Sequence, residues 1–192
     1  MLKALIPSLV LAGAIMGSSA QAAEGSADKL IGFEFGVGYH LIDDSRYEGV
    51  STNFGLVIPV GQKFDVVVYH EIGRYYGKQD GTKSNIDSDI NELRFRVTAW
   101  ENEKMAVKLL LGIGYADMTE QETGVDFSQV VADLGINFTV LKAQSGPVKG
   151  EIALNALYRH LKFAEEDLNF APGEDVSKLG GFVIGMNAGL FF

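Results

Sequence analysis

The sequence predicts an all-β fold, an eight-stranded antiparallel up-and-down β-barrel whose strands cross a membrane. Apolar and polar residues alternate with period two in eight segments of about ten residues, the length that a tilted strand needs to cross a bilayer core. The connections between these segments alternate between long and short. The chain also has 23 glycines, too many for a helical domain.

The first 22 residues are predicted to be a signal peptide. Lys3 supplies the positive start, residues 4–16 are mostly apolar, and Ala20-Gln21-Ala22 has the small-x-small form of a cleavage site. We expect cleavage after Ala22. The apolar run is too short for a membrane-spanning helix, which needs about 20 residues. Residues 23–192 are then one barrel domain.

Composition excludes several functions. The formal net charge is −9 and the isoelectric point is near 4.8, which argues against nucleic acid, because phosphate binding needs a basic surface. Cysteine is absent, so disulfides, thiolate metal sites and cysteine nucleophiles are excluded. A chain of 192 residues that is 47% hydrophobic suits one folded domain. We expect no cofactor.

The N-terminal half contains four predicted strands. The clearest begins the barrel, because every second residue from Ile31 to Leu41 is apolar and the residues between them are small or polar. The four strands are predicted at Lys29 to Leu41, Thr52 to Val60, Phe64 to Tyr75 and Ile90 to Trp100. Gly61-Gln62-Lys63 forms a short turn, whereas Asp43 to Gly49 and Gly77 to Asp89 are predicted polar loops.

The C-terminal half repeats this arrangement. Its predicted strands are Met105 to Ala116, Phe127 to Leu141, Val148 to Phe163 and Leu179 to Phe192. The predicted short turns are Glu101 to Lys104 and Lys142 to Pro147, and the predicted long loops are Asp117 to Asp126 and Ala164 to Lys178. The last strand must pair with both the seventh and the first, since only closure removes unpaired strand edges from lipid.

Strand parity assigns one face to lipid and the other to the lumen. A soluble lipocalin-like barrel has the same period with its apolar face inside, so alternation alone does not distinguish a membrane barrel from a soluble one. Here the polar face is mainly small residues around a few charges, as a narrow lumen requires. The apolar face carries aromatic residues near strand ends, which is typical of membrane-interface girdles: Phe33, Tyr39, Phe54, Phe64, Tyr115, Phe138, Tyr158 and Phe192.

The lumen is predicted to hold a charge network. Its acids are Glu34, Asp65, Glu71, Glu92, Asp133 and Glu151, and its bases are Arg94, Arg96, Lys108 and Arg159, with His40 near the outer end. These groups must pair, because an isolated buried charge costs several kcal/mol. We expect interlocked ion pairs that fill the lumen. The alternative is a narrow gated path in which the pairs exchange partners.

No catalytic motif emerges. His40 precedes Asp43, Asp44 and Ser45, the nearest approach to a Ser-His-acid composition, but histidines wetted at strand ends are the simpler interpretation. His160 lacks a serine two residues on. The Asp87-Ser88-Asp89 segment begins like a calcium loop, yet Glu92 occupies the position that requires glycine. The sequence therefore predicts a protein that is not an enzyme.

Acidic residues gather in the predicted long loops. They are Asp43, Asp44, Glu48, Glu120, Glu122, Asp126, Glu165, Glu166, Asp167, Glu174 and Asp175. Solvated loop surface is the simplest explanation. The alternatives are divalent cations that bridge these acids to anionic lipopolysaccharide, or a basic partner. Tyr47, Phe170 and Ala171 are predicted to add apolar surface there.

From Leu30 to Phe192, the strand pattern, loop order and terminal aromatic resemble small eight-stranded bacterial outer-membrane barrels, porin-family proteins typified by the OmpA membrane domain, OmpX and OmpW. The resemblance implies short periplasmic turns and four long extracellular loops. It implies that Phe192, with Leu190, is part of the signal read by the barrel insertion machinery, although Asn187 stands where that signal favours glycine.

The resemblance also implies a role. The expected one is a non-enzymatic integral barrel in envelope integrity or surface interaction, in contact with outer-membrane lipid and lipopolysaccharide. The alternatives are a narrow pore, a transport barrel for small hydrophobic molecules, or a lipid A modifying enzyme.

Overall fold

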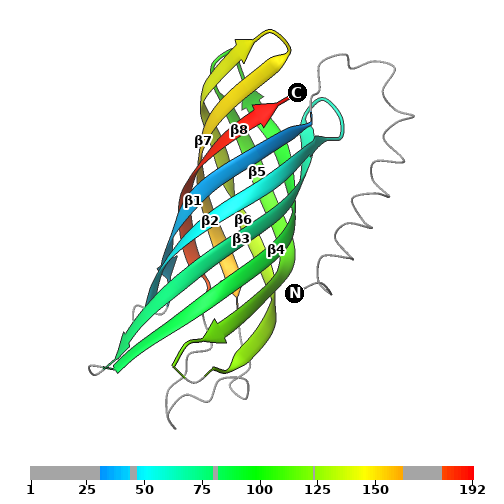
Figure 1. Ribbon diagram of the computed structural model, residues 1–192. Coiled ribbons are helices and arrows are strands. Elements are labelled where there is room, and N and C mark those ends of the chain that lie inside the picture. Colours follow the sequence, from blue (N-terminus) through cyan, green and yellow to red (C-terminus); the bar gives the residue numbers. More distant parts are fainter. Residues whose placement is uncertain (1–30, 44–46, 80–81, 123, 162–178) are drawn as a thin grey trace.

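The computed structural model describes residues 31–43, 47–79, 82–122, 124–161 and 179–192, and these form a closed antiparallel β-barrel of eight strands (Figure 1). Each strand pairs with the next along the chain, and β1 also pairs with β8. The strands are β1 (Gly32–Ile42), β2 (Tyr47–Pro59), β3 (Phe64–Gln79), β4 (Thr82–Glu101), β5 (Ala106–Glu120), β6 (Asp126–Ser145), β7 (Val148–Leu161) and β8 (Gly181–Phe191). The predicted fold class is confirmed.

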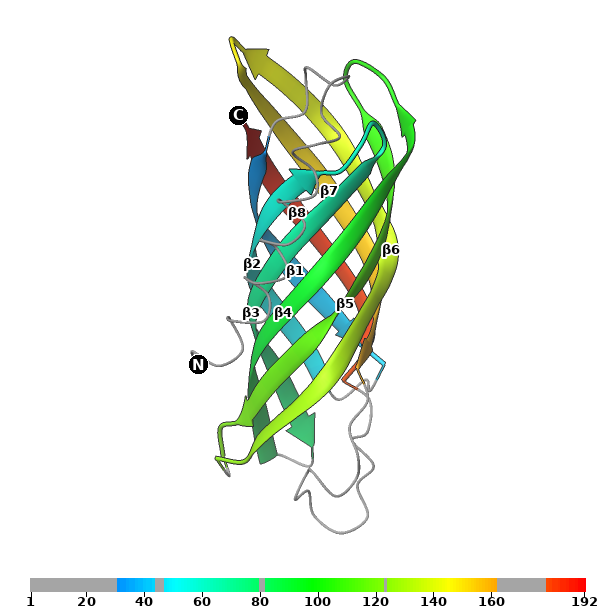
Figure 2. The ribbon, with the colours of Figure 1, turned by 90° about the vertical axis from the view of Figure 1, so that its right-hand side faces the viewer.

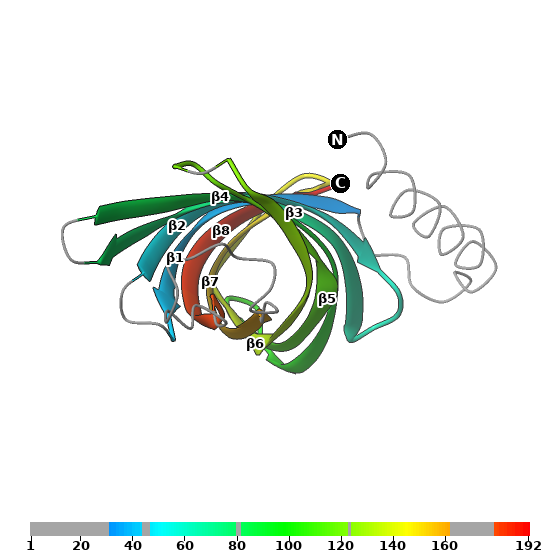
Figure 3. The same cartoon turned by 90° about the horizontal axis from the view of Figure 1, so that it is seen from below.

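The last strand closes the barrel as predicted. Its register with β1 runs from Gly32 opposite Phe191 to Ile42 opposite Gly181, and its other edge pairs with β7. The Phe192 N–H donates to the carbonyl of Ile31 at 3.0 Å, which ties the two ends of the described chain together. Viewed along its axis, the barrel is a complete ring (Figure 3).

The barrel has two distinct ends. The turn end carries the β2–β3, β4–β5 and β6–β7 connections together with Phe192, and it lies uppermost in Figure 1. The loop end carries the other four connections (Figures 1 and 2). Parts of the β1–β2 and β5–β6 connections, and the predicted loop at 164–178, lie outside the described residues, as does the predicted signal peptide.

The strands extend further at the loop end than predicted. The predicted loop at Gly77 to Asp89 is mostly a β-hairpin, in which pairing continues to Gln79 opposite Thr82. The predicted loops at Asp43 to Gly49 and Asp117 to Asp126 are likewise partly strand. These predictions were wrong because apolar residues on the inner face continue toward the loop end after the apolar residues on the outer face stop. The buried apolar side chains of the inner face at this end include Tyr75, Ile86, Ile90, Met118 and Phe127.

Two β-bulges reverse strand parity near the turn end. The β4–β5 register shifts between Thr98 and Trp100, so Trp100, which strict alternation with Arg94 and Arg96 would turn toward the lumen, is 48% exposed. The β6–β7 register shifts between Thr139 and Leu141, and Leu141 is exposed. A bulge inserts one residue that has no opposite partner, so every later side chain changes face.

The outer face is apolar and the inner face is mixed. Large exposed apolar side chains alternate along β1, β5, β7 and β8 with residues that face the lumen, in agreement with the predicted parity. The described part of the chain includes no helix that is both long and apolar enough to span a bilayer.

Candidate functional site: the barrel lumen

Arg159 of β7 is the centre of the lumen. Its guanidinium donates to Glu71 of β3 at 2.6 Å, to Asp133 of β6 at 2.9 Å and to Glu92 of β4 at 3.3 Å. Arg159 is 1% exposed, so its charge lies far from bulk water. One arginine therefore links three carboxylates from three separate strands.

Arg94 provides the second positive charge. Its Nε donates to Glu92 at 2.6 Å and its Nη2 donates to Asp133 at 2.8 Å. The guanidinium carbon lies 3.2 Å from the centre of the Tyr69 ring, a cation–π geometry, and the Tyr69 hydroxyl donates to Glu71 at 2.6 Å. We call Glu71, Glu92, Arg94, Asp133 and Arg159 the central network. Every carboxylate in it accepts from an arginine, which offsets the cost of burying the charges.

His40 lies beside the central network, and its prediction as a wetted strand-end histidine was wrong. The side chain is 2% exposed. Its Nε2 is 2.9 Å from Ser51 Oγ and 3.5 Å from Glu71 Oε1, and its ring meets Tyr75 edge-on. The neighbouring Gly49 leaves the room for this packing, because a Cβ there would lie 2.7 Å from Tyr75 and 3.2 Å from His40.

The His40 arrangement does not form a catalytic triad. In a triad the acid binds one ring nitrogen and the serine binds the other. Here Ser51 and Glu71 both approach Nε2, while Nδ1 is 3.5 Å from the Tyr75 hydroxyl. Asp43, the described member of the predicted composition, instead accepts a hydrogen bond from Tyr158. Asp44 and Ser45 lie outside the described residues.

An apolar cluster fills the lumen between the central network and the loop end. We call it the loop-end cluster, and its buried members are Tyr47, Tyr75, Ile86, Ile90, Ala116, Met118, Phe127, Val131, Leu161 and Leu179. Tyr47 was predicted to be exposed loop surface, but it is 7% exposed because its strand begins earlier than predicted. The signal that sequence reasoning missed is the alternation of Tyr75 and Gly77, and of Ile86, Ser88 and Ile90, on the inner face.

A further group of polar contacts lies between the central network and the turn end. Arg96 donates to Glu34 at 2.8 Å through Nη1, and Asn137 donates to Asn155 at 2.6 Å. The Arg96 Nε and Nη2 atoms have no hydrogen-bond partner among the described residues, although the side chain is buried. Phe191 lies nearby, packed against the buried Val57, Val67 and Tyr69.

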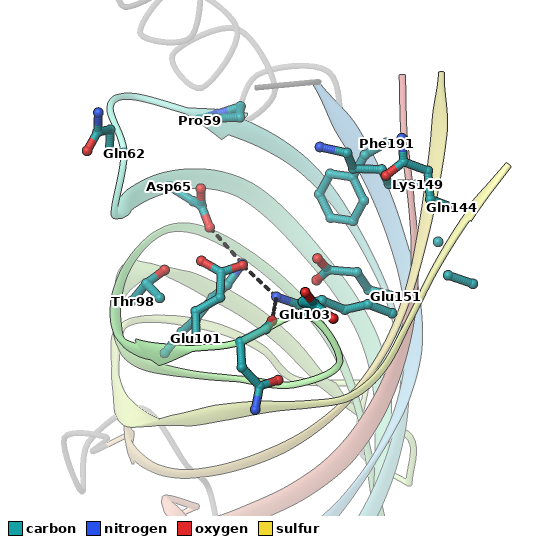
Figure 4. Close-up of a pocket in the computed structure, with 15 residues that line it drawn as sticks. Pro59, Gln62, Asp65, Thr98, Glu101, Glu103, Gln144, Lys149, Glu151 and Phe191 are labelled. Carbon is teal, nitrogen blue, oxygen red and sulfur yellow. Dashed lines mark hydrogen bonds and ion pairs between the residues drawn. The ribbon is translucent and has the colours of Figure 1, made fainter. Parts of the chain in front are cut away.

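The lumen opens at the turn end into a cavity of about 420 Å³, which we call the vestibule (Figure 4). Lys108 donates to Asp65 at 3.0 Å and Lys142 pairs with Glu101. Glu151 also lines the vestibule. It accepts a hydrogen bond from Thr139 at 3.5 Å and forms no ion pair with any described residue.

Nine of the ten predicted lumen charges therefore pair with one another, and Glu151 does not.

The acids at the loop end bond to neighbouring strands. Asp87 pairs with Arg74 and raises the pKa of that guanidinium through this hydrogen bond, and Glu48 accepts from Tyr39. Glu122 accepts from the Asn85 backbone at 2.9 Å. Among the described residues, no group of three or more histidine, cysteine, aspartate or glutamate side chains is placed to hold a metal ion. The predicted acids from Glu165 to Asp175, with Phe170 and Ala171, lie outside the described residues.

Solved structures similar to this chain are small β-barrels, and the fold is supported by the first of the three. Neisserial surface protein A superposes with a TM-score of 0.51 at 12% identity, over 87% of this chain and 97% of that chain. Ail, the attachment invasion locus protein of Yersinia pestis, gives 0.41 at 13% identity, over 83% and 96%. The N-terminal β-barrel domain of Pseudomonas aeruginosa OprF gives 0.39 at 9% identity, over 84% and 97%. No protein-family model and no curated protein matches the chain.

Proposed function

We propose that the protein is an integral barrel of the bacterial outer membrane whose lumen is closed, and that it acts in envelope integrity or surface interaction without catalysing a reaction. The observation that carries this proposal is the central network backed by the loop-end cluster. Ion pairs join β3, β4, β6 and β7 across the lumen, and buried apolar side chains fill the space next to them. Together, the central network and the loop-end cluster block the lumen.

The outer face supports a membrane location. Leu134, Ile113 and Phe182 are each more than half exposed, and they belong to a continuous series of exposed apolar side chains on the strands. Water would make so large an apolar surface prone to association, whereas acyl chains solvate it. A soluble lipocalin-like barrel would place its apolar face inside, where this chain has the central network. Outer-membrane lipid and lipopolysaccharide are the proposed partners of this face.

The geometry around His40 supports a role without catalysis. Ser51 and His40 are buried beside the central network, and Ser51 and Glu71, a member of that network, both approach the same ring nitrogen of His40. A lipid A modifying enzyme would need a nucleophile that reaches the bilayer. Ser51 faces the lumen and is 6% exposed.

Planar-bilayer recording tests the closed lumen. The purified barrel, shown to be folded by heat-modifiable migration in a detergent gel, is expected to produce no unitary current across the accessible range of voltage, because the buried ion pairs leave no continuous water path. Discrete conductance steps from the same preparation would contradict this proposal and favour the narrow pore.

We also propose that Phe192, with Leu190, is read by the barrel insertion machinery. Both side chains are exposed on the outer face at the turn end, beside the start of β1. Phe192→Ala is expected to lower the fraction of heat-modifiable barrel in cells while leaving the unfolding midpoint of the folded protein unchanged. The matched control is Phe182→Ala, which removes an equally exposed ring at the other end of β8. Equal assembly of the two variants would show that the terminal aromatic is incidental.

A further inference from the structure

The vestibule is a blind cavity with the dimensions of a ligand site. Its volume of about 420 Å³ falls within the range of small-molecule pockets, roughly 300 to 1,000 Å³. Side chains from β2 to β8 line it, with Asp65, Thr98 and Glu101 on one side and Glu151 and Phe191 on the other (Figure 4). The central network lies deeper in the lumen, so a molecule that enters from the turn end can bind but meets a closed floor.

The charges in the vestibule do not balance. Four carboxylates line it (Asp65, Glu101, Glu103 and Glu151) and three amines (Lys108, Lys142 and Lys149), which leaves one excess negative charge. Two of the amines are already paired with Asp65 and Glu101. Glu151 has no ion pair among the described residues and is the vestibule carboxylate that also lines a second, smaller cavity. The vestibule therefore favours a positively charged group beside Glu151.

A second, smaller cavity adjoins the vestibule. Glu151 and Phe191 line both cavities, and the smaller one has a volume of about 10 Å³, room for one water-sized group. Arg96, Asn187 and Glu34 line this inner cavity, and Glu34 is paired with Arg96 through Nη1 alone. Arg96 and Asn187 are 3% and 4% exposed, and the Arg96 Nε and Nη2 donors and the Asn187 Oδ1 acceptor have no partner among the described residues.

These unused groups define the chemistry of a ligand. A guanidinium whose Nε and Nη2 donors are unbonded matches a carboxylate, whereas a carboxylate without an ion pair matches an ammonium. The inner cavity admits one oxygen-sized atom beside Arg96, and Glu151 lines both this cavity and the vestibule, so the two ligand charges must lie only a few ångströms apart. A metal ion fits poorly, because no group of three or more acidic, histidine or cysteine side chains among the described residues is placed to hold one.

We propose that the vestibule binds a compact zwitterion of the α-amino acid class. One carboxylate oxygen enters the inner cavity between Glu151 and Phe191 and accepts from Arg96. The ammonium stays in the vestibule and donates to Glu151, and the rest of the molecule lies in the vestibule against the Phe191 ring. This inference goes beyond the closed lumen of the proposed function, and its measurement is binding, not current.

Titration of the purified barrel in detergent micelles, followed by amide NMR, tests the proposal. L-Alanine is expected to shift the Glu151, Asn187 and Phe191 signals saturably. Ethylammonium and propionate each carry one of the two charges, and we expect each to bind about tenfold or more weakly, as the loss of one charge-assisted contact predicts. Equal binding of ethylammonium would overturn the zwitterion assignment. No saturable shift with L-alanine would mean that the inner cavity holds only water, and would overturn the site.

Three variants locate the site. Glu151→Gln removes the ammonium partner, and Arg96→Lys keeps the positive charge beside Glu34 but removes the unbonded guanidinium donors. Both are expected to abolish saturable binding of L-alanine while the barrel remains heat-modifiable. Glu103→Gln removes the same charge from the exposed rim of the vestibule and is the matched control. An equal loss in the control would show nonspecific attraction and overturn the assignment.

Discussion

The centre of the lumen and its turn end both contain ion pairs, but those at the centre are buried and those at the turn end surround an open cavity. At the centre, charged groups are fully buried and each carboxylate of the central network accepts from at least one arginine. At the turn end, Lys142 pairs with a half-exposed Glu101 around an open cavity. The comparison indicates that a fully buried lumen charge depends on its ion-pair partners for stability, whereas a charge beside an open cavity can also be stabilised by water.

The largest expected effect comes from removing the centre of the buried half. Arg159→Met leaves Glu71, Glu92 and Asp133 close together without their shared cation. Breaking a buried ion pair from one side costs about 3 to 5 kcal/mol. Urea unfolding in lipid vesicles is expected to show a loss of that size, or no folded barrel.

The matched control for this variant lies in the vestibule. Lys142→Met removes the same charge from a pair whose acid is half-exposed, so we expect a loss below about 1 kcal/mol. Similar losses for the two variants would break the comparison between the buried and open halves.

A smaller effect is expected from added volume. Gly135 lies two residues from Asp133, and a Cβ there would come within 2.4 Å of Leu157 Cβ and 2.5 Å of the Ala156 carbonyl. Because the backbone must shift, Gly135→Ala is expected to lower the free energy of unfolding by about 1 to 3 kcal/mol. The control is Gly150→Ala at the vestibule, where the nearest atom is 3.9 Å away and the expected change is within about 0.5 kcal/mol. A neutral Gly135→Ala would mean that the centre is less tightly packed than its contacts indicate.

Strand parity predicted much of the fold and the set of inward charges. The period of two is a local property of the chain, so Arg94 and Arg96 on one strand, and Arg159 on another, could be assigned to the lumen without knowing any partner. The same argument placed Leu190 and Phe192 on the outer face. Closure between the first and last strands followed from the cost of unpaired edges in lipid.

The remaining features depend on contacts between strands, which the alternation within a single strand does not predict. The bulge before Trp100 arises from pairing between β4 and β5, and nothing in the alternation of β4 alone marks it. His40 is buried because Ser51, Tyr75 and Glu71 from two other strands surround it. Which carboxylate meets which arginine depends on strand tilt and shear, so the isolation of Glu151 could not be read from the sequence.

The β3–β4 hairpin is longer than the apolar belt of the barrel requires. The 20 residues of β4 extend about 65 Å along the strand, and about 50 Å along the barrel axis at a tilt near 40°. An apolar belt about 25 Å tall accounts for only half of that height. The excess lies at the loop end, where Arg74 and Asp87 face outward. The segment predicted as a polar loop is thus largely a paired hairpin beyond the apolar belt, and its hydrogen-bonded backbone offers a protease few free amides.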